Sequence, residues 1–179
     1  VIIGVVLARY FMFIANLFQE PKAIKFYYTY LAFTLVSILQ FYMQWYTGKQ
    51  ANIMIEGKTF VFAITTFMDA IAYIGGLIIV PHDTLLEGCF AMKSWFMKIK
   101  RAYFFMMVLC YLALQIQAVL GLFNITEDSV LTAGQLIYVA GGAVPMILLN
   151  VVSAFSKNDY YLSFHGTLMV VISSYNLSQ

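Results

Sequence analysis

The sequence predicts an all-α fold, a polytopic bundle of about six transmembrane helices, with five as the alternative. Hydrophobic residues make up 63% of the 179 residues and charged residues only 10%, against about one half and one quarter in soluble domains. The apolar runs approach or reach the roughly 20 residues that cross hydrocarbon as a helix. They are continuous, whereas a transmembrane barrel would show short alternating stretches. We therefore expect a single transmembrane domain over residues 1–179.

Six apolar runs give the expected spans. In chain order they are residues 1–18, 26–46, 59–80, 102–123, 130–155 and 162–175. Pro21 interrupts the chain after the first run, and the stretch 47–58 reads as a loop after the second. The last run is short and polar, which is why five spans remain the alternative.

A basic amphipathic segment, residues 85–100, precedes the fourth expected span. Its large apolar side chains alternate with Glu87, Lys93, Lys98 and Lys100, and Arg101 follows. This pattern is typical of a helix that lies in the headgroup region of a membrane. Lysines and arginines gather in the loops after the first, third and fifth spans, so the positive-inside rule places those loops in the cytoplasm.

Ionisable side chains inside the expected spans are Arg9, Asp69 and His165. A charged group at the centre of a membrane helix costs about 3 kcal/mol, so it must face a partner, water or the bundle interior. Arg9 and Asp69 both lie near the middle of their runs. We expect a structural ion pair between them, and the alternative is an ion or proton pathway through Asp69.

Amide side chains form a second group within the spans. They are Gln40, Gln44, Gln115 and Asn150. Gln40 and Gln44 lie one turn apart on the same helix face, with Ser37 a further turn back. Such groups form interhelical hydrogen bonds of about 1 kcal/mol or less. The alternative is that these amides and Asp69 line one polar cavity.

Glycine pairs at positions 75–76 and 141–142 permit close packing between helices. No metalloprotease, nucleophile-elbow or phosphate-loop motif is present in the sequence, nor any His and Cys spacing typical of a metal site. We therefore expect no cofactor and no metal. The net charge of +2 is too small to indicate a nucleic-acid partner.

Several of these stretches together resemble a family of small bacterial multi-pass membrane proteins for which no activity is established. The stretches are "LARYFMFIANLF", "YYTYLAFTLVSILQFYMQWY", "GGLIIVP", "SWFMKIKRAYFF" and "SFHGTLMV". Trp45 and Tyr46 stand where that family tends to carry two tryptophans. The resemblance covers most of the chain and implies a multi-pass topology in a bacterial inner membrane. It implies no activity.

Two classes of function follow from these patterns. The first is a non-enzymatic membrane protein, either a small channel or transporter or a membrane-embedded subunit of a larger assembly. Its partners would be the lipid bilayer and either further copies of itself or a membrane complex. The alternative is an enzyme that acts on lipid at the cytoplasmic interface, where His82, Asp83 and Glu87 are the candidate acid and base groups.

Overall fold

The computed structural model describes residues 2–19, 24–54, 66–67, 70–71, 74–81, 90–125 and 133–178. The helices are α1 (Ile2–Gln19), α2 (Tyr28–Met54), α4 (Met92–Ile125), α5 (Ala133–Phe155) and α6 (Asp159–Ser178), and the strands are β1 (Ile24–Lys25) and β2 (Phe90–Ala91). Residues 66–67, 70–71 and 74–79 are also helical. Apart from the two short strands the described chain is thus helical, which confirms the predicted all-α class.

Among the residues that the structure describes, no helix is both long and apolar enough to cross a membrane. The six transmembrane spans stay a prediction.

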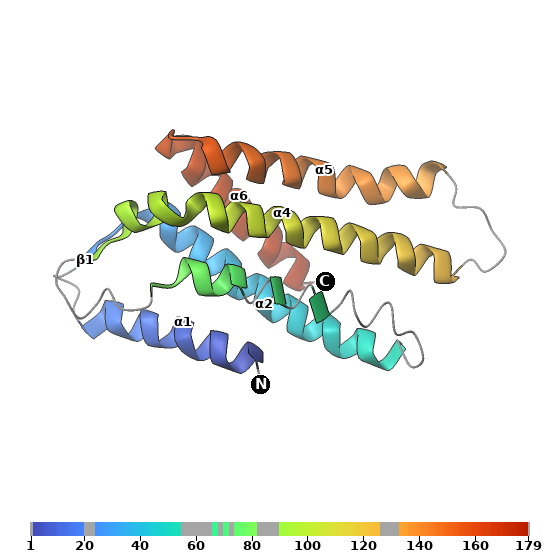
Figure 1. Ribbon diagram of the computed structural model, residues 1–179, viewed down its shortest axis with the longest axis horizontal. Helices are drawn as coiled ribbons and strands as arrows, with labels where there is room; N and C mark the ends of the chain where they lie inside the picture. The colour runs from blue at the N-terminus through green and yellow to red at the C-terminus, as the bar shows by residue number, and fades with distance from the viewer. Residues whose placement is uncertain are drawn as a thin grey trace.

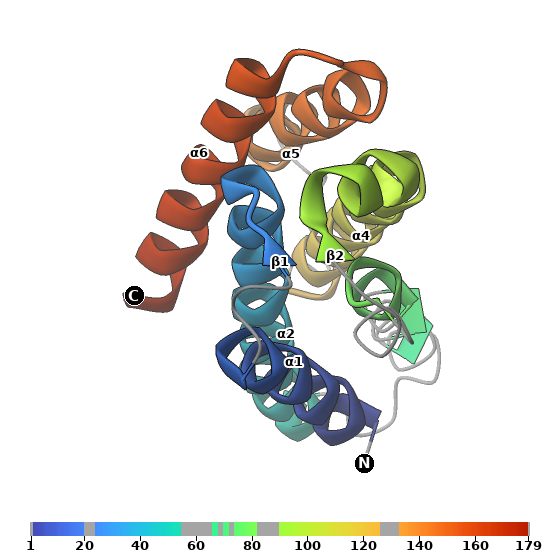
Figure 2. The ribbon, with the colours of Figure 1, turned by 90° about the vertical axis from the view of Figure 1, so that its left-hand side faces the viewer.

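The helices form two packed pairs. α4 and α5 run side by side along the length of the molecule, and α6 packs against α2 (Figures 1 and 2). At one end, β1 and β2 form a parallel pair in which Ile24 lies opposite Phe90 and Lys25 opposite Ala91. This strand pair ties the chain just before α2 to the chain just before α4.

Two predicted boundaries are wrong. The expected loop 47–58 is helical as far as Met54, as the end of α2, because Lys49, Gln50, Ala51 and Met54 are good helix formers and no proline interrupts the stretch. Of the basic segment 85–100, residues 85–89 lie outside the described residues, and Phe90–Ala91 form β2. From Met92 onward it is the start of the 34-residue helix α4, since no glycine or proline separates it from the next apolar run.

The inner face of α4 explains why the two predicted parts form one helix. Met92, Phe96, Tyr103 and Met107 are buried at helical spacing, so one apolar stripe continues across the predicted boundary. α6 also begins earlier and ends later than predicted. It spans 20 residues.

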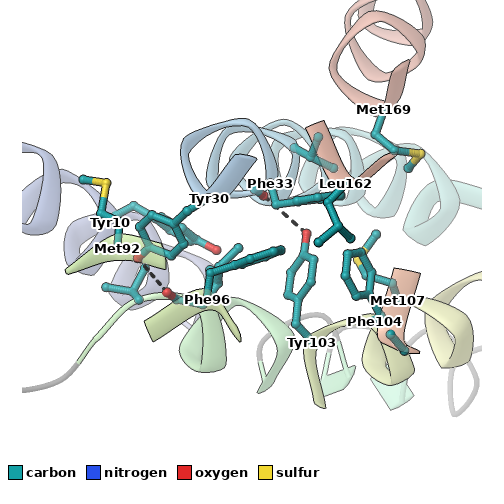
Figure 3. Packing of buried hydrophobic residues seen from close by; sticks show 14 of the residues in the cluster. Tyr10, Tyr30, Phe33, Met92, Phe96, Tyr103, Phe104, Met107, Leu162 and Met169 are labelled. Carbon is teal, nitrogen blue, oxygen red and sulfur yellow. Dashed lines mark hydrogen bonds between the residues drawn. The ribbon is translucent and has the colours of Figure 1, made fainter. Parts of the chain in front are cut away.

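An aromatic cluster fills the space between α2 and α4 (Figure 3). The Phe33 ring of α2 stacks on Phe96 with the ring centroids 5.6 Å apart, and it meets Phe104 edge-on at 4.9 Å. Tyr30 and Tyr103 complete the cluster, and both are almost fully buried. The size of these rings therefore sets the distance between α2 and α4.

The contact between α2 and α6 is of a different kind, because small residues line it. A Cβ atom added to Gly166 would lie 3.1 Å from Ala32 Cβ and 3.4 Å from the Phe33 ring. One turn away, the hydroxyls of Thr29 and Ser163 are 2.7 Å apart. Small residues and a hydroxyl pair allow this close approach, as in membrane helix bundles.

The glycines that the sequence singled out behave differently from one another. A Cβ added to Gly75 would lie 3.5 Å from Met106 Cβ, an ordinary contact with α4. A Cβ added to Gly141 would meet nothing within 4 Å. Close packing is therefore supported at Gly75 and not at Gly141, and Gly166 was not foreseen.

We expect Gly166→Leu to destabilise the protein by roughly 1–3 kcal/mol, because the new side chain overpacks the contact with Ala32 and Phe33. Gly141→Leu is the matched control. It places the same side chain in open space within a helix, where leucine is favoured over glycine by up to about 1 kcal/mol. Thermal unfolding of both purified variants tests this. Equal melting temperatures for the two variants would contradict the tight α2–α6 contact at Gly166.

Candidate functional site

Polar side chains are buried among the aromatic rings at the middle of the bundle. The Ser37 hydroxyl on α2 lies 2.9 Å from the Tyr103 hydroxyl on α4. Ser37 also donates to the Phe33 carbonyl at 3.0 Å, and Tyr103 reaches that carbonyl at 3.3 Å. We call Ser37, Tyr103, Ser153 and His165 the polar centre.

Ser153 on α5 and His165 on α6 form the other half of the polar centre. The Ser153 hydroxyl lies 2.6 Å from His165 Nδ1. Both side chains are 0% exposed. The imidazole stacks on Phe104 with the centroids 5.8 Å apart, and it meets Phe33 edge-on at 5.3 Å. Within the described part of the chain, His165 Nε2 has no hydrogen-bond partner.

A serine beside a histidine is the first requirement of a nucleophile and its base. A catalytic pair also needs a group that orients the histidine, and it needs access for a substrate. Among the residues that the structure describes, no carboxylate contacts His165, and neither side chain reaches the surface. The arrangement therefore joins α5 to α6 by a buried hydrogen bond, and it does not present a nucleophile.

The predicted amides do not share one partner. Gln40 on α2 donates to the Tyr111 hydroxyl of α4 at 3.5 Å, a long hydrogen bond. Asn150 is buried, and it donates to the Met146 carbonyl of its own helix at 2.7 Å. Gln115 is half-buried on α4. The side chain of Gln44 lies outside the described residues.

Arg9 was expected to pair with Asp69, which lies outside the described residues. The half-buried guanidinium of Arg9 lies 3.4 Å from the Val80 carbonyl oxygen, just after the helical residues 74–79. The expected proximity of the first and third apolar runs is therefore found. Whether Asp69 is structural or part of a pathway stays a prediction.

At one end of the bundle α4 begins, α5 ends and α6 begins (left in Figure 1). The chain carries several basic residues in and beside these helix ends. We call this group the basic end. Its members are Lys25, Lys93, Lys98, Lys100, Arg101 and Lys157. The sequence predicted Lys93, Lys98, Lys100 and Arg101 as interfacial residues. The other predicted interfacial residues, His82, Asp83 and Glu87, lie outside the described part of the chain.

Asp159 anchors the first turn of α6 to α4 and α2. Its carboxylate accepts hydrogen bonds from the Lys93 ammonium and, at 2.9 Å, from the Tyr27 hydroxyl. The hydrogen bond from Lys93 holds the pKa of Asp159 below its ordinary value, and the Tyr27 hydrogen bond lowers this pKa further. Asn158 caps the same turn by accepting from the backbone N–H of Tyr160 at 2.9 Å.

Lys100 is nearly buried, and it donates to the Ser156 carbonyl just beyond the end of α5. A cation at a helix C-terminus is stabilised by the exposed carbonyl groups there. Burial lowers the pKa of Lys100, and the nearby charges of Arg101 and Lys157 lower it further. Lys100 therefore joins α4 to the turn between α5 and α6.

Three residues of these sites were missed by sequence reasoning, namely Tyr103, Ser153 and Asp159. Asp159 could have been found, because the sequence "KND" after an apolar run is typical of a helix start. Tyr103 and Ser153 gave no signal of their own. Their importance depends on partners 66 and 12 positions away in the chain.

No metal site is found within the described ranges, where no group of three or more His, Cys, Asp or Glu side chains is suitably placed. Comparisons with protein-family models, with curated proteins and with solved structures give no match. The family resemblance seen in the sequence therefore stays a prediction.

Removing the Ser153 hydroxyl should leave His165 buried without this hydrogen bond. We expect Ser153→Ala to destabilise the protein by roughly 1–3 kcal/mol, the cost of an unsatisfied buried polar group. Adding His165→Phe should restore much of the loss, because a phenyl ring fills a similar space and needs no partner. Chemical denaturation of both single variants and the double variant measures the coupling. Additive effects would show that the pair is not coupled.

The ion pair between Lys93 and Asp159 should make stability depend on pH in acid. Because the folded-state pKa of Asp159 lies below its ordinary value, the pair stabilises the fold above that ordinary value. The contribution is lost as the pH falls through the lowered folded-state pKa, below about pH 4. Melting temperatures from neutral pH down to about pH 3 should fall less steeply for Asp159→Asn than for the parent chain.

Lys93→Gln should flatten the acid dependence in the same way. Lys98→Gln is its matched control, because Lys98 lies over the Trp95 ring, 6.0 Å from the centroid. It removes a positive charge from the same helix while leaving the pair intact. If Lys98→Gln flattened the profile as much as Lys93→Gln, the pair would not be its cause.

Proposed function

We propose that this chain is a non-enzymatic integral membrane protein that crosses the bilayer several times. It acts either as a small channel or transporter or as a membrane-embedded subunit of a larger assembly. The observation that carries the proposal is the distribution of side chains: broad apolar faces point outward from α4 and α5, while polar groups are buried between the helices.

The outer faces of α4 and α5 are apolar over several turns. The exposed residues are Phe105, Leu109, Leu112 and Ile116 on α4, and Val144, Leu148, Val152 and Phe155 on α5. Each is 42–58% exposed. They recur every three or four residues, so each set forms one stripe along its helix. Contiguous apolar surface of this kind marks a membrane or a protein partner.

The interior shows the complementary pattern. Lys100, Ser153 and His165 are buried and pair with groups from other segments, while the buried Asn150 donates to a carbonyl of its own helix. Polar groups that pair between helices while large apolar residues face outward are typical of bundles in lipid. The composition, with 63% hydrophobic residues, supports the same proposal.

Between a pathway and a subunit, we favour the subunit. The middle of the bundle is filled by the rings of Phe33, Phe96, Phe104 and His165, which contact one another at centroid distances of 4.9–6.2 Å. Such packing leaves an ion little room to pass. The exposed apolar faces would then contact lipid and either a second copy of the chain or other subunits. Following the family resemblance, we propose a bacterial inner membrane as the location.

Fractionation tests membrane integration. We expect the full chain, expressed in bacteria, to stay with the membrane pellet after an alkaline carbonate wash, because its apolar faces are covered by lipid. A peripheral protein would be released into the supernatant. Release of the folded protein would contradict the proposal. A soluble cytoplasmic protein expressed in the same way serves as the control.

Reconstitution separates the possible activities. If the chain is a subunit of a larger assembly, we expect neither ion flux nor lipid turnover in liposomes that contain only the purified chain. Flux that is lost in Asp69→Asn while the melting temperature is kept would instead show a pathway through Asp69. Turnover of lipid without flux would indicate the interfacial enzyme, with His82 and Asp83 as the first residues to replace.

A further inference from the structure

The cations of the basic end differ in what they contact. Lys93 is bound by Asp159, and Lys100 by the Ser156 carbonyl. Arg101 and Lys157 are exposed, and both lie close enough to Lys100 for their charges to act on it. Among the described residues, Asp159 is the carboxylate at this end, and Lys93 holds it. The turn between α5 and α6 therefore carries clustered positive charge.

Arg101 also marks a change in the character of the surface. Its guanidinium carbon lies 5.6 Å from the centroid of the Phe155 ring. Phe155 meets Phe105 edge-on, with the centroids 6.1 Å apart. Both rings are about half exposed, at 57% and 46%. A cation thus lies over an exposed aromatic pair contributed by two neighbouring helices.

The two outer faces continue from this aromatic pair in the same order. Along α4, Arg101 is followed by Phe105 and then by Leu109. Along α5, read backward from the turn, Lys157 is followed by Phe155 and then by Val152. In membrane proteins, basic side chains lie at the headgroups, aromatic rings at the interface and aliphatic side chains against the acyl chains. Both faces follow this order.

We propose that Arg101 and Lys157 bind the phosphate of an anionic phospholipid whose acyl chains lie along the outer faces of α4 and α5. This inference rests on the proposed function, because it gives the lipid-facing surface a preferred lipid. The guanidinium supplies planar donors to the phosphate oxygens, and the ammonium supplies a second positive charge. The Phe105 and Phe155 rings contact the start of the chains.

A free phosphate ion would be drawn by the same cations, but the apolar surface beside them would contribute nothing to its binding. A phospholipid uses both parts of the surface. Phosphatidylglycerol carries a net negative charge and phosphatidylcholine does not, so the excess positive charge at this turn favours the former. Each basic side chain near an anionic membrane surface contributes about 1 kcal/mol, or roughly a fivefold change in affinity.

The test titrates short-chain phosphatidylglycerol, short-chain phosphatidylcholine and inorganic phosphate into the detergent-solubilised full chain, and follows bound ligand by native mass spectrometry. We expect phosphatidylglycerol to bind most tightly. The double variant Arg101→Gln/Lys157→Gln should weaken that binding roughly thirtyfold, and it should weaken phosphatidylcholine binding less, because the choline cation offsets the charge of the same phosphate. The matched control, Lys25→Gln/Lys98→Gln, removes two exposed charges of the same end and should change binding less than threefold.

The possible results separate the lipid site from its rivals. Equal losses in the two double variants would show general charge attraction and overturn the site. Inorganic phosphate binding as tightly as phosphatidylglycerol would overturn the lipid as ligand. Equal binding of the two lipids would overturn the proposed preference for phosphatidylglycerol. It would not bear on membrane integration, which the carbonate wash measures separately. Melting temperatures of the lipid-free variants confirm that both fold.

Discussion

The packing of one side chain, Phe33, determines how the helices of this bundle are arranged. Its ring is only 1% exposed, and it contacts Phe96 and Phe104 of α4 and His165 of α6. The carbonyl of the same residue accepts hydrogen bonds from Ser37 and Tyr103. The ring and backbone at one position of α2 thus contact two other helices, α4 and α6, and the remaining contacts have to be compatible with that geometry.

Two different distances between helices follow from this position. Toward α4, whole aromatic rings stand between the backbones, and the polar centre lies among them. Toward α6, Gly166 lies directly against Ala32 and against the edge of the Phe33 ring, so the helices approach closely. A single residue can serve both contacts because the small residues lie on one side of it and the aromatic residues on the other. Larger residues at the contact between α2 and α6 would displace the Phe33 ring, on which the packing of α4 and α6 depends.

The sequence predicted the class of the fold and most helix positions, because composition and long apolar runs depend on residues that are near one another in the chain. It failed at residues 47–54 and 92–100, where polar and basic side chains predicted a loop and a separate interfacial segment but the chain is part of α2 and α4. Helix formation depends there on local propensity and on one continuous buried stripe, and not on average polarity. Arg9 was expected to pair with Asp69, and the described residues show only that its guanidinium lies against the Val80 carbonyl at the end of the third run.

The candidate sites were harder to predict, because they join residues that are distant in the chain. His165 was singled out as an ionisable group, yet its partner Ser153 lies on another helix and is an ordinary serine in sequence. Lys93 was predicted to be interfacial, which stays a prediction, and its ammonium is bound by Asp159, a partner that the pattern did not indicate. A pattern shows that a charge exists and where along the chain it lies. It does not show whether a neighbouring helix supplies a counter-charge.

The basic end contains two kinds of cation, those that are bound within the protein and those that are exposed. Lys93 and Lys100 hold α4 against α6 and against the end of α5, so their charges are used within the protein. They also hold the turn between α5 and α6, where Arg101 and Lys157 both lie near Lys100 and Phe155 lies beside Phe105. The bound cations, Lys93 and Lys100, thereby position the exposed ones, Arg101 and Lys157. In the proposed bilayer, fold stability and lipid preference would depend on different members of one basic cluster, so the two properties can be altered separately.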